Sequence, residues 1–160
     1  MPPKHEELPS LNGKTVDEPR KVHSTPVSME NMENIVQVLV VDDEPAVALA
    51  IKSALKFCGY AVSTVNNAQA ALDSIQAEPG RYSVVLSDHN MPRIGGIALV
   101  KALRGIDYPG RIVILSAYLT MENEEQYQAL GVDQILSKPF NIERLRLAFE
   151  RALAPTACQS

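Results

Sequence analysis

Short apolar runs alternate with longer amphipathic stretches through residues 35–154 of this chain. The apolar runs have the length of buried strands, and they occupy residues 36–41, 60–65, 83–87, 111–115 and 134–136. After four of the five runs, apolar residues recur every three or four positions, as on one face of a helix, whereas a charged helix is expected between Thr120 and Gly131. Strands that alternate with helices predict a parallel sheet with helices on both faces. We therefore expect an α/β fold, a doubly wound five-stranded parallel sheet in a (βα)5 three-layer sandwich.

Proline, polar caps and glycine mark where these helices begin and end. Pro45 suits the first turn of the helix after the first strand, and Gly59 suits its end. Side chains that can cap a helix N-terminus precede three other helices, namely Asn66 or Asn67, Thr120 and Asn141. The buried face of the last helix is expected to hold Ile142, Leu145, Phe149, Ala152 and Leu153.

Residues 1–34 hold few apolar side chains that a folded segment could bury. They hold 5 of the 11 prolines, and all 8 aromatic residues of the chain follow Asn34. A segment with so little apolar surface cannot offset the entropy lost on folding. We predict a disordered tail or linker over 1–34, a folded domain over 35–154 and a flexible C-terminus over 155–160. A solvated leader and a docking peptide are alternative interpretations of the tail.

The composition limits the compartment and the partners. The net charge is −4, and no basic face offsets it to attract nucleic acid. No apolar run approaches the roughly 20 residues that span a bilayer, and the N-terminus has no secretory pattern. The two cysteines, Cys58 and Cys158, do not make a disulfide framework. We expect a cytoplasmic protein with no direct nucleic-acid or membrane partner.

Acidic, hydroxyl and ammonium side chains follow the predicted strands. Asp42 and Asp43 follow the first strand, Asp88 the third, Ser116 the fourth and Lys138 the fifth. In doubly wound sheets the ligand site lies at the carboxyl ends of the strands. If the first strand lies between the second and the third, the three carboxylates converge, and two of them about 4 Å apart repel by roughly 4 kcal/mol. Such a cluster needs a cation or raised pKa values, and carboxylates suit Mg²⁺ beside a phosphoryl group.

Five short motifs occur in order along the folded part of the chain. They are VVDDEP at 40–45, SDHNMP at 87–92, Gly95-Gly96, LSA at 115–117 and KPF at 138–140. Together they resemble the receiver domain of two-component response regulators, which has the flavodoxin-like fold. Each motif alone is weak, but their order and spacing make the combination highly specific. The resemblance extends from about Ile35 to Leu153.

The resemblance implies that Asp88 is the phospho-acceptor and that Ser116 and Lys138 assist it. The phosphoryl donor would be a histidine kinase or a histidine phosphotransfer protein. The domain would then switch conformation and control an output protein that the sequence does not name. The catalysis implied is limited to the domain's own Mg²⁺-dependent phosphorylation and dephosphorylation.

The same resemblance implies a Mg²⁺ site, with Mn²⁺ as a substitute. Asp43 would bind the ion directly, and Asp42 would bind it through water or as a second ligand. Asp88 and the backbone carbonyl of Asn90 would complete the protein ligands. Receivers also commonly have a cis peptide bond before the proline that follows the lysine, which here is Lys138-Pro139.

Several positions depart from the usual receiver pattern or invite a role. Ile135 stands where many receivers carry an aromatic residue that moves inward with the switch hydroxyl, so the signal must leave by another route. Tyr118 is bulky for its position, and we expect it to shield the phosphoryl group and slow hydrolysis. His89 is expected to be an exposed loop histidine. Residues expected near a partner-docking face are Tyr127, Arg144 and Arg146.

Three other classes of protein compete with this interpretation. A haloacid-dehalogenase-like phosphatase would need a D-x-D arrangement after the first strand, where the acids here are adjacent. A flavodoxin-like electron carrier would need a hydroxyl- and glycine-rich phosphate loop there, and the chain has no P-loop motif either. A pseudo-receiver is never phosphorylated. The acceptor-site residues argue against that class, but Ile135 leaves it open.

Overall fold

The computed structural model describes residues 35–155. The predicted tail over 1–34 lies outside the described residues, as do residues 156–160 of the predicted flexible C-terminus. In the described part, strands and helices alternate in the order β1 (Gln37–Val41), α2 (Pro45–Phe57), β2 (Ala61–Val65), α3 (Ala68–Ala77), β3 (Val84–Asp88), α4 (Gly96–Gly105), β4 (Arg111–Ser116), α5 (Met121–Ala129), β5 (Gln134–Ser137) and α6 (Ile142–Leu153). Every predicted strand is present, with both ends within one residue of the prediction.

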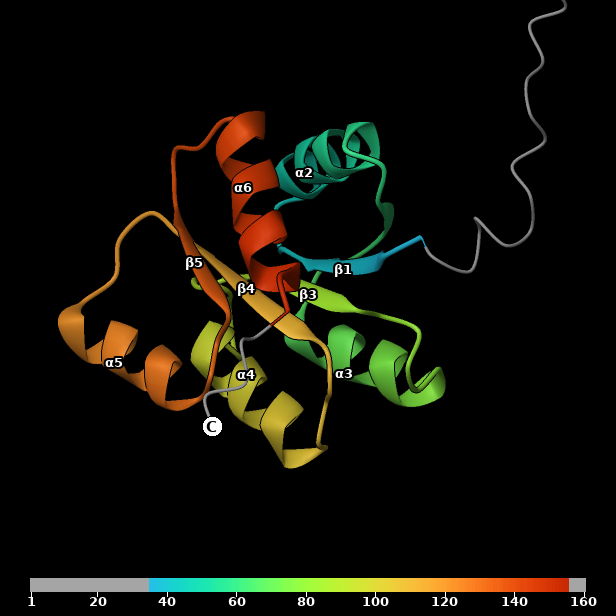
Figure 1. The fold of residues 1–160 in the computed structure, drawn as a ribbon. Coiled ribbons are helices and arrows are strands. Elements are labelled where there is room, and N and C mark those ends of the chain that lie inside the picture. Colours follow the sequence, from blue (N-terminus) through green and yellow to red (C-terminus); the bar gives the residue numbers. More distant parts are fainter. Residues whose placement is uncertain (1–34, 156–160) are drawn as a thin grey trace, which may run out of the picture. The chain divides into compact units, whose positions relative to one another are not determined.

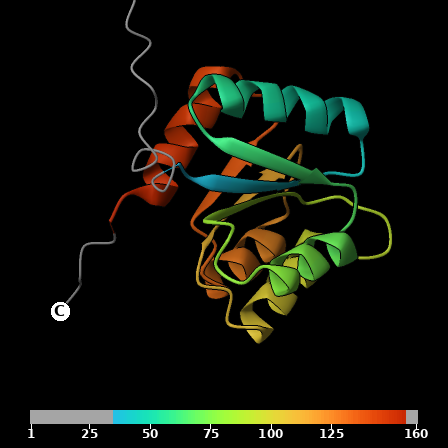
Figure 2. The ribbon, with the colours of Figure 1, turned by 90° about the vertical axis from the view of Figure 1, so that its right-hand side faces the viewer.

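The sheet is entirely parallel, with the strand order β2-β1-β3-β4-β5 (Figure 1). Helices α2 and α6 cover one face of the sheet, and α3, α4 and α5 cover the other (Figure 2). The predicted doubly wound α/β sandwich is therefore confirmed. Because β1 lies between β2 and β3, the carboxyl ends of β1 and β3 are neighbours, as the convergence of the acids requires.

Successive side chains of a strand point to opposite faces of the sheet, so each face has its own hydrophobic core. In β1, Val38 belongs to the core that includes Phe149 of α6, whereas Leu39 belongs to the core that includes Leu103 of α4. All four of these side chains are fully buried. A central strand that is covered on both faces must be apolar at successive positions, which explains the continuous apolar run. Within residues 35–155, no helix is both long and apolar enough to cross a membrane.

Most of the predicted helix boundaries are confirmed. The side chains of Asn67, Thr120 and Asn141 accept hydrogen bonds from the N–H three residues later, at 2.7, 3.1 and 2.9 Å. Gly59 follows α2 with φ +94°, in the left-handed region that favours glycine. The prediction for Ile142 is wrong, because this first residue of α6 is 42% exposed and the buried face of the helix begins one turn later, at Leu145.

Candidate functional site

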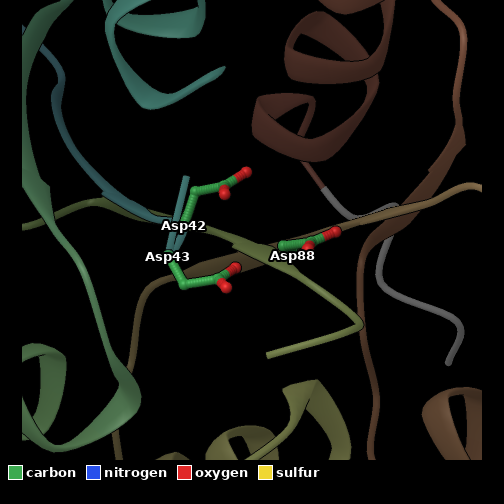
Figure 3. A group of neighbouring side chains, drawn as sticks. All are labelled: Asp42, Asp43 and Asp88. Carbon is green, nitrogen blue, oxygen red and sulfur yellow. The ribbon is translucent and has the colours of Figure 1, made fainter. Parts of the chain in front are cut away.

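Three carboxylates converge at the carboxyl ends of β1 and β3. Asp42 and Asp43 directly follow β1, and Asp88 is the last residue of β3. The ladder pairs Val41 with Ser87, so the residues after them lie side by side. One oxygen of each carboxylate lies within 4.8 Å of the others, and the three side chains point into the same space (Figure 3). The structure thus brings together the three acids that the sequence placed at strand ends.

Asp42 is almost completely buried, at 2% exposed. Its Oδ1 accepts a hydrogen bond from the Glu44 N–H at 2.9 Å, whereas its Oδ2 has no hydrogen-bond partner within residues 35–155. Burial raises the pKa of the Asp42 carboxyl, and the charge of Asp88 raises it further. Leaving a buried carboxylate oxygen without a donor is costly. The Oδ2 atom is therefore suited to bind a cation.

Lys138 brings one positive charge to the acids. Its Nζ donates to Asp88 Oδ1 at 3.0 Å and lies 4.0 Å from Asp42 Oδ2. The backbone N–H of Lys138 donates to the Ser116 carbonyl at 2.8 Å, which holds the end of β5 beside β4. The Lys138-Pro139 peptide bond is cis, as predicted. One ammonium against three carboxylates leaves the group with a formal charge of −2.

Ser116 is buried at the end of β4, and its hydroxyl belongs to a local turn. The Oγ donates to the Tyr118 carbonyl at 2.8 Å and accepts from the Tyr118 N–H at 3.2 Å. The side chain of Tyr118 is 75% exposed beside this turn. Asn90 has an exposed side chain in the loop between β3 and α4. The Ser116 hydroxyl therefore lies at the end of the strand next to β3 but forms its hydrogen bonds with Tyr118 and not with the acids.

The donor set of this cluster fits a hard divalent cation. Its ligand atoms are carboxylate oxygens at the ends of two adjacent strands, and one of them is buried without a donor among residues 35–155. Lys138 offsets only part of their negative charge. Mg²⁺ prefers oxygen ligands of this kind and keeps open positions for water or phosphate oxygens. A carboxylate, an ammonium group and a hydroxyl around such an ion are the components of a phosphoryl-transfer site.

The prediction of an exposed His89 is wrong. The imidazole is half-buried, with Nδ1 2.6 Å from Tyr127 Oη and Nε2 3.3 Å from Asn123 Nδ2. Burial lowers the pKa of His89. The spacing of four between Asn123 and Tyr127 placed them on one helix face. No pattern in the sequence indicated that this face of the helix contacts His89, which lies more than 30 residues earlier in the chain.

Tyr127 lies on α5, the fourth helix of the described residues, where the resemblance placed it near a docking face. It is completely buried, and burial raises the pKa of its hydroxyl, so it offers no surface to a partner. Arg144 is exposed on α6, while Arg146 forms ion pairs with Glu143 and Glu150 of its own helix. The side chain of Tyr127 is therefore covered in this arrangement, and the docking role of Arg144 and Arg146 stays a prediction.

The family model of the response regulator receiver domain matches residues 38–150. The chain therefore belongs to this family, the phospho-accepting receiver domains of two-component signalling. The match spans β1 through most of α6 and so includes every strand end that contributes to the cluster of acids.

Individual relatives agree with this assignment. The chain is 36% identical over 118 residues to the response regulator MprA of Mycobacterium tuberculosis, covering 74% of this chain and 50% of that protein. It is 30% identical to the uncharacterized transcriptional regulatory protein YkoG of Bacillus subtilis, covering 72% and 50%. The chain thus spans about half the length of these curated relatives. The structure of the chemotaxis protein CheY4 of Vibrio cholerae matches with a TM-score of 0.69 and 32% identity, covering 74% of this chain and 99% of that one.

Proposed function

We propose that Asp88 is the phospho-acceptor and takes its phosphoryl group from a phosphohistidine on a histidine kinase or a histidine phosphotransfer protein. The observation that carries this assignment is the 3.0 Å hydrogen bond from Lys138 Nζ to Asp88 Oδ1 within the cluster of three acids. Among the clustered acids, Asp88 combines this contact with a position at the end of β3, beside Ser116 of β4. Membership of the receiver family supports the same role.

The transfer forms one bond and breaks one. An oxygen of the Asp88 carboxylate attacks the phosphorus of the phosphohistidine. The new P–O bond forms as the P–N bond breaks, and the nitrogen keeps the bonding electron pair. The imidazole takes up a proton and leaves as a neutral histidine, while Asp88 becomes an acyl phosphate. Attack of water on this acyl phosphate restores the carboxylate and releases inorganic phosphate, so the domain's chemistry is confined to its own phosphorylation and dephosphorylation.

The surrounding residues prepare the site for a charged phosphoryl group. The ligands of Mg²⁺, or of Mn²⁺ in its place, would be Asp42, Asp43, Asp88 and the backbone carbonyl of Asn90. When bound, the ion offsets the negative charge of the acids and of the incoming phosphoryl oxygens. Lys138 is positioned to contact the same oxygens, since its Nζ already lies at the acceptor carboxylate. Ser116 can donate to a phosphoryl oxygen once its hydroxyl releases the Tyr118 carbonyl.

The output of the domain is a change of protein contacts. A phosphorylated receiver acts through conformations that differ in affinity for a partner. We propose an output protein or output domain as that partner, without direct contact to nucleic acid or membrane by the receiver itself. Family membership also supports the cytoplasmic location expected from the sequence.

Intact-mass spectrometry after incubation with acetyl phosphate and Mg²⁺ tests the proposal. We expect the wild type to gain one phosphoryl group, and Asp88→Asn to gain none. Asp73→Asn is the matched control, because it removes an exposed acid of α3 outside the site and should leave the adduct unchanged. Absence of an adduct in the wild type under all conditions would favour a pseudo-receiver that binds partners without phosphorylation.

A further inference from the structure

Helix α5 is weakly anchored to the rest of the domain. Of its residues Met121–Ala129, only Tyr127 is buried. The helix packs chiefly against α4. Its sequence, MENEEQYQA, offers no continuous apolar stripe. An element with few buried apolar contacts has low local stability, and the position of α5 therefore depends on what Tyr127 contacts.

Tyr127 contacts the residue next to the proposed phospho-acceptor. Besides the 2.6 Å approach of its Oη to His89 Nδ1, the two rings meet edge to face with centroids 5.6 Å apart. Asn123, one turn earlier, lies at the other ring nitrogen of His89. Both nitrogens of the imidazole therefore face α5, which is held to this single side chain at two successive turns.

His89 is in turn fixed to the acceptor strand and its neighbours. Its N–H donates to the Leu115 carbonyl of β4 at 2.8 Å, and its carbonyl accepts from the Gly96 N–H at 2.9 Å. Gly96 leaves the space that Tyr127 occupies, because a Cβ at this position would lie 2.5 Å from Tyr127 Oη. A backbone shift at Asp88 therefore reaches Tyr127 through one adjacent residue.

The loop that leads into α5 is a second connection between the acceptor site and this helix, and a cavity lies beside the loop. The loop between β4 and α5 is held by the hydrogen bonds between Ser116 and Tyr118. A cavity of about 360 Å³ lies beside this turn and reaches Glu124 of α5 and Ile135 of β5. When the Ser116 hydroxyl leaves Tyr118, the loop and the first turn of α5 can shift into this space.

We propose that the contact between His89 and Tyr127 makes α5 the element that responds to phosphorylation of Asp88, in place of an aromatic side chain at position 135. The inference rests on the proposed function of Asp88. A phosphoryl group adds negative charge one residue from His89 and draws Ser116 away from Tyr118. The first change acts on the middle of α5 and the second on its start. Two arrangements of α5 then present different surfaces to a partner.

Nuclear magnetic resonance with beryllofluoride as the phosphoryl mimic tests this route. The chain has 3 histidines, so ¹⁵N-histidine labelling isolates the ring nitrogens of His89, and His89→Gln assigns them. With Mg²⁺ and beryllofluoride, we expect wild-type shifts at these ring nitrogens and at the backbone amides of residues 121–129. The amides of Asp43 and Lys138 should shift as well, because they report occupation of the acceptor site.

Tyr127→Phe keeps the ring and removes the hydroxyl. Loss of one net hydrogen bond should change the ratio of the two α5 arrangements by about two- to tenfold, so the α5 shifts shrink while those of Asp43 and Lys138 persist. Tyr108→Phe is the matched control, because Tyr108 is also buried and its hydroxyl donates to the Tyr82 carbonyl at 3.0 Å, away from α5. This control should respond like the wild type.

Two results would overturn the inference while leaving the proposed function intact. In the first, the site amides shift in the wild type but the His89 ring nitrogens and α5 do not. In the second, the α5 response of Tyr127→Phe equals that of the wild type. The wild-type ring signals decide the matter even if Tyr127→Phe does not fold. If no wild-type amide at the acceptor site shifts and acetyl phosphate forms no adduct, the proposed function itself fails and the inference with it.

Discussion

Replacing Asp43 with asparagine should stabilise the domain in metal-free buffer. Asp43 shares the cluster with Asp42 and Asp88, with one oxygen of each within 4.8 Å of the others. At 4.8 Å and an effective dielectric near 20, each pair of like charges repels by about 3.5 kcal/mol, so the two neighbouring charges repel that of Asp43 by about 7 kcal/mol before screening. Asp43 is only half-buried, and solvent and salt screen most of this repulsion. We expect the free energy of unfolding to rise by about 1–2 kcal/mol.

Urea unfolding followed by far-ultraviolet circular dichroism measures this change, which suits a chain without tryptophan. Mg²⁺ should stabilise the wild type by mass action, and Asp43→Asn should lose most of that gain. Asp73→Asn, which removes an exposed acid of α3, should behave as the wild type in both buffers. Lower stability of Asp43→Asn than of the wild type without metal, or equal stabilisation of both proteins by Mg²⁺, would contradict a repulsive cluster that binds the ion.

Three further changes test other parts of the account. Tyr118→Ala should shorten the lifetime of the aspartyl phosphate by admitting water, and a lifetime equal to or longer than the wild type contradicts the shielding role. Gly96→Ala should cost about 1–3 kcal/mol in urea unfolding, because its Cβ would lie 2.5 Å from Tyr127 Oη. Gly105→Ala, whose Cβ would meet nothing within 4 Å, is the control, and equal losses would refute the steric reason. Because burial raises the pKa of Asp42, its folded form binds a proton more tightly than its unfolded form. In metal-free buffer, the contribution of Asp42 to the free energy of unfolding should therefore increase as the pH falls through the raised pKa toward the ordinary 3.8. Asp42→Asn should lose this increase when the free energy of unfolding is measured across the same pH range. Identical pH profiles for the two proteins would contradict it.

The strands and the convergence of the acids could be predicted because each depends on local pattern and on general rules of parallel sheets. The run over 36–41 is apolar at successive positions because both faces of β1 are covered. Asp42, Asp43 and Asp88 follow from strand ends that share one edge of the sheet. The hydrogen bond from Lys138 to Asp88 follows from the same rule applied to β5.

The surroundings of His89 could not be predicted from local pattern. Whether a loop histidine is exposed depends on what packs over it, and here that is α5, which has no apolar periodicity to fix its orientation. Tyr127 gave no signal that it faces inward, because the residues one turn earlier on its face of the helix, Asn123 and Glu124, are polar. The Oδ2 of Asp42, which has no hydrogen-bond partner among the described residues, likewise arises from the packing around the site, since the Glu44 N–H contacts only the other oxygen.

The most direct test of the central claim is to map the phosphoryl group to a residue. The wild-type protein is incubated with acetyl phosphate and Mg²⁺, the acyl phosphate is reduced with borohydride, and the digested peptides are sequenced by mass spectrometry. Reduction converts a phosphorylated aspartate to homoserine, so the account predicts homoserine at position 88 and aspartate at positions 42 and 43. Homoserine at another position, or none at position 88 when the intact protein carries the phosphoryl group, would contradict the account.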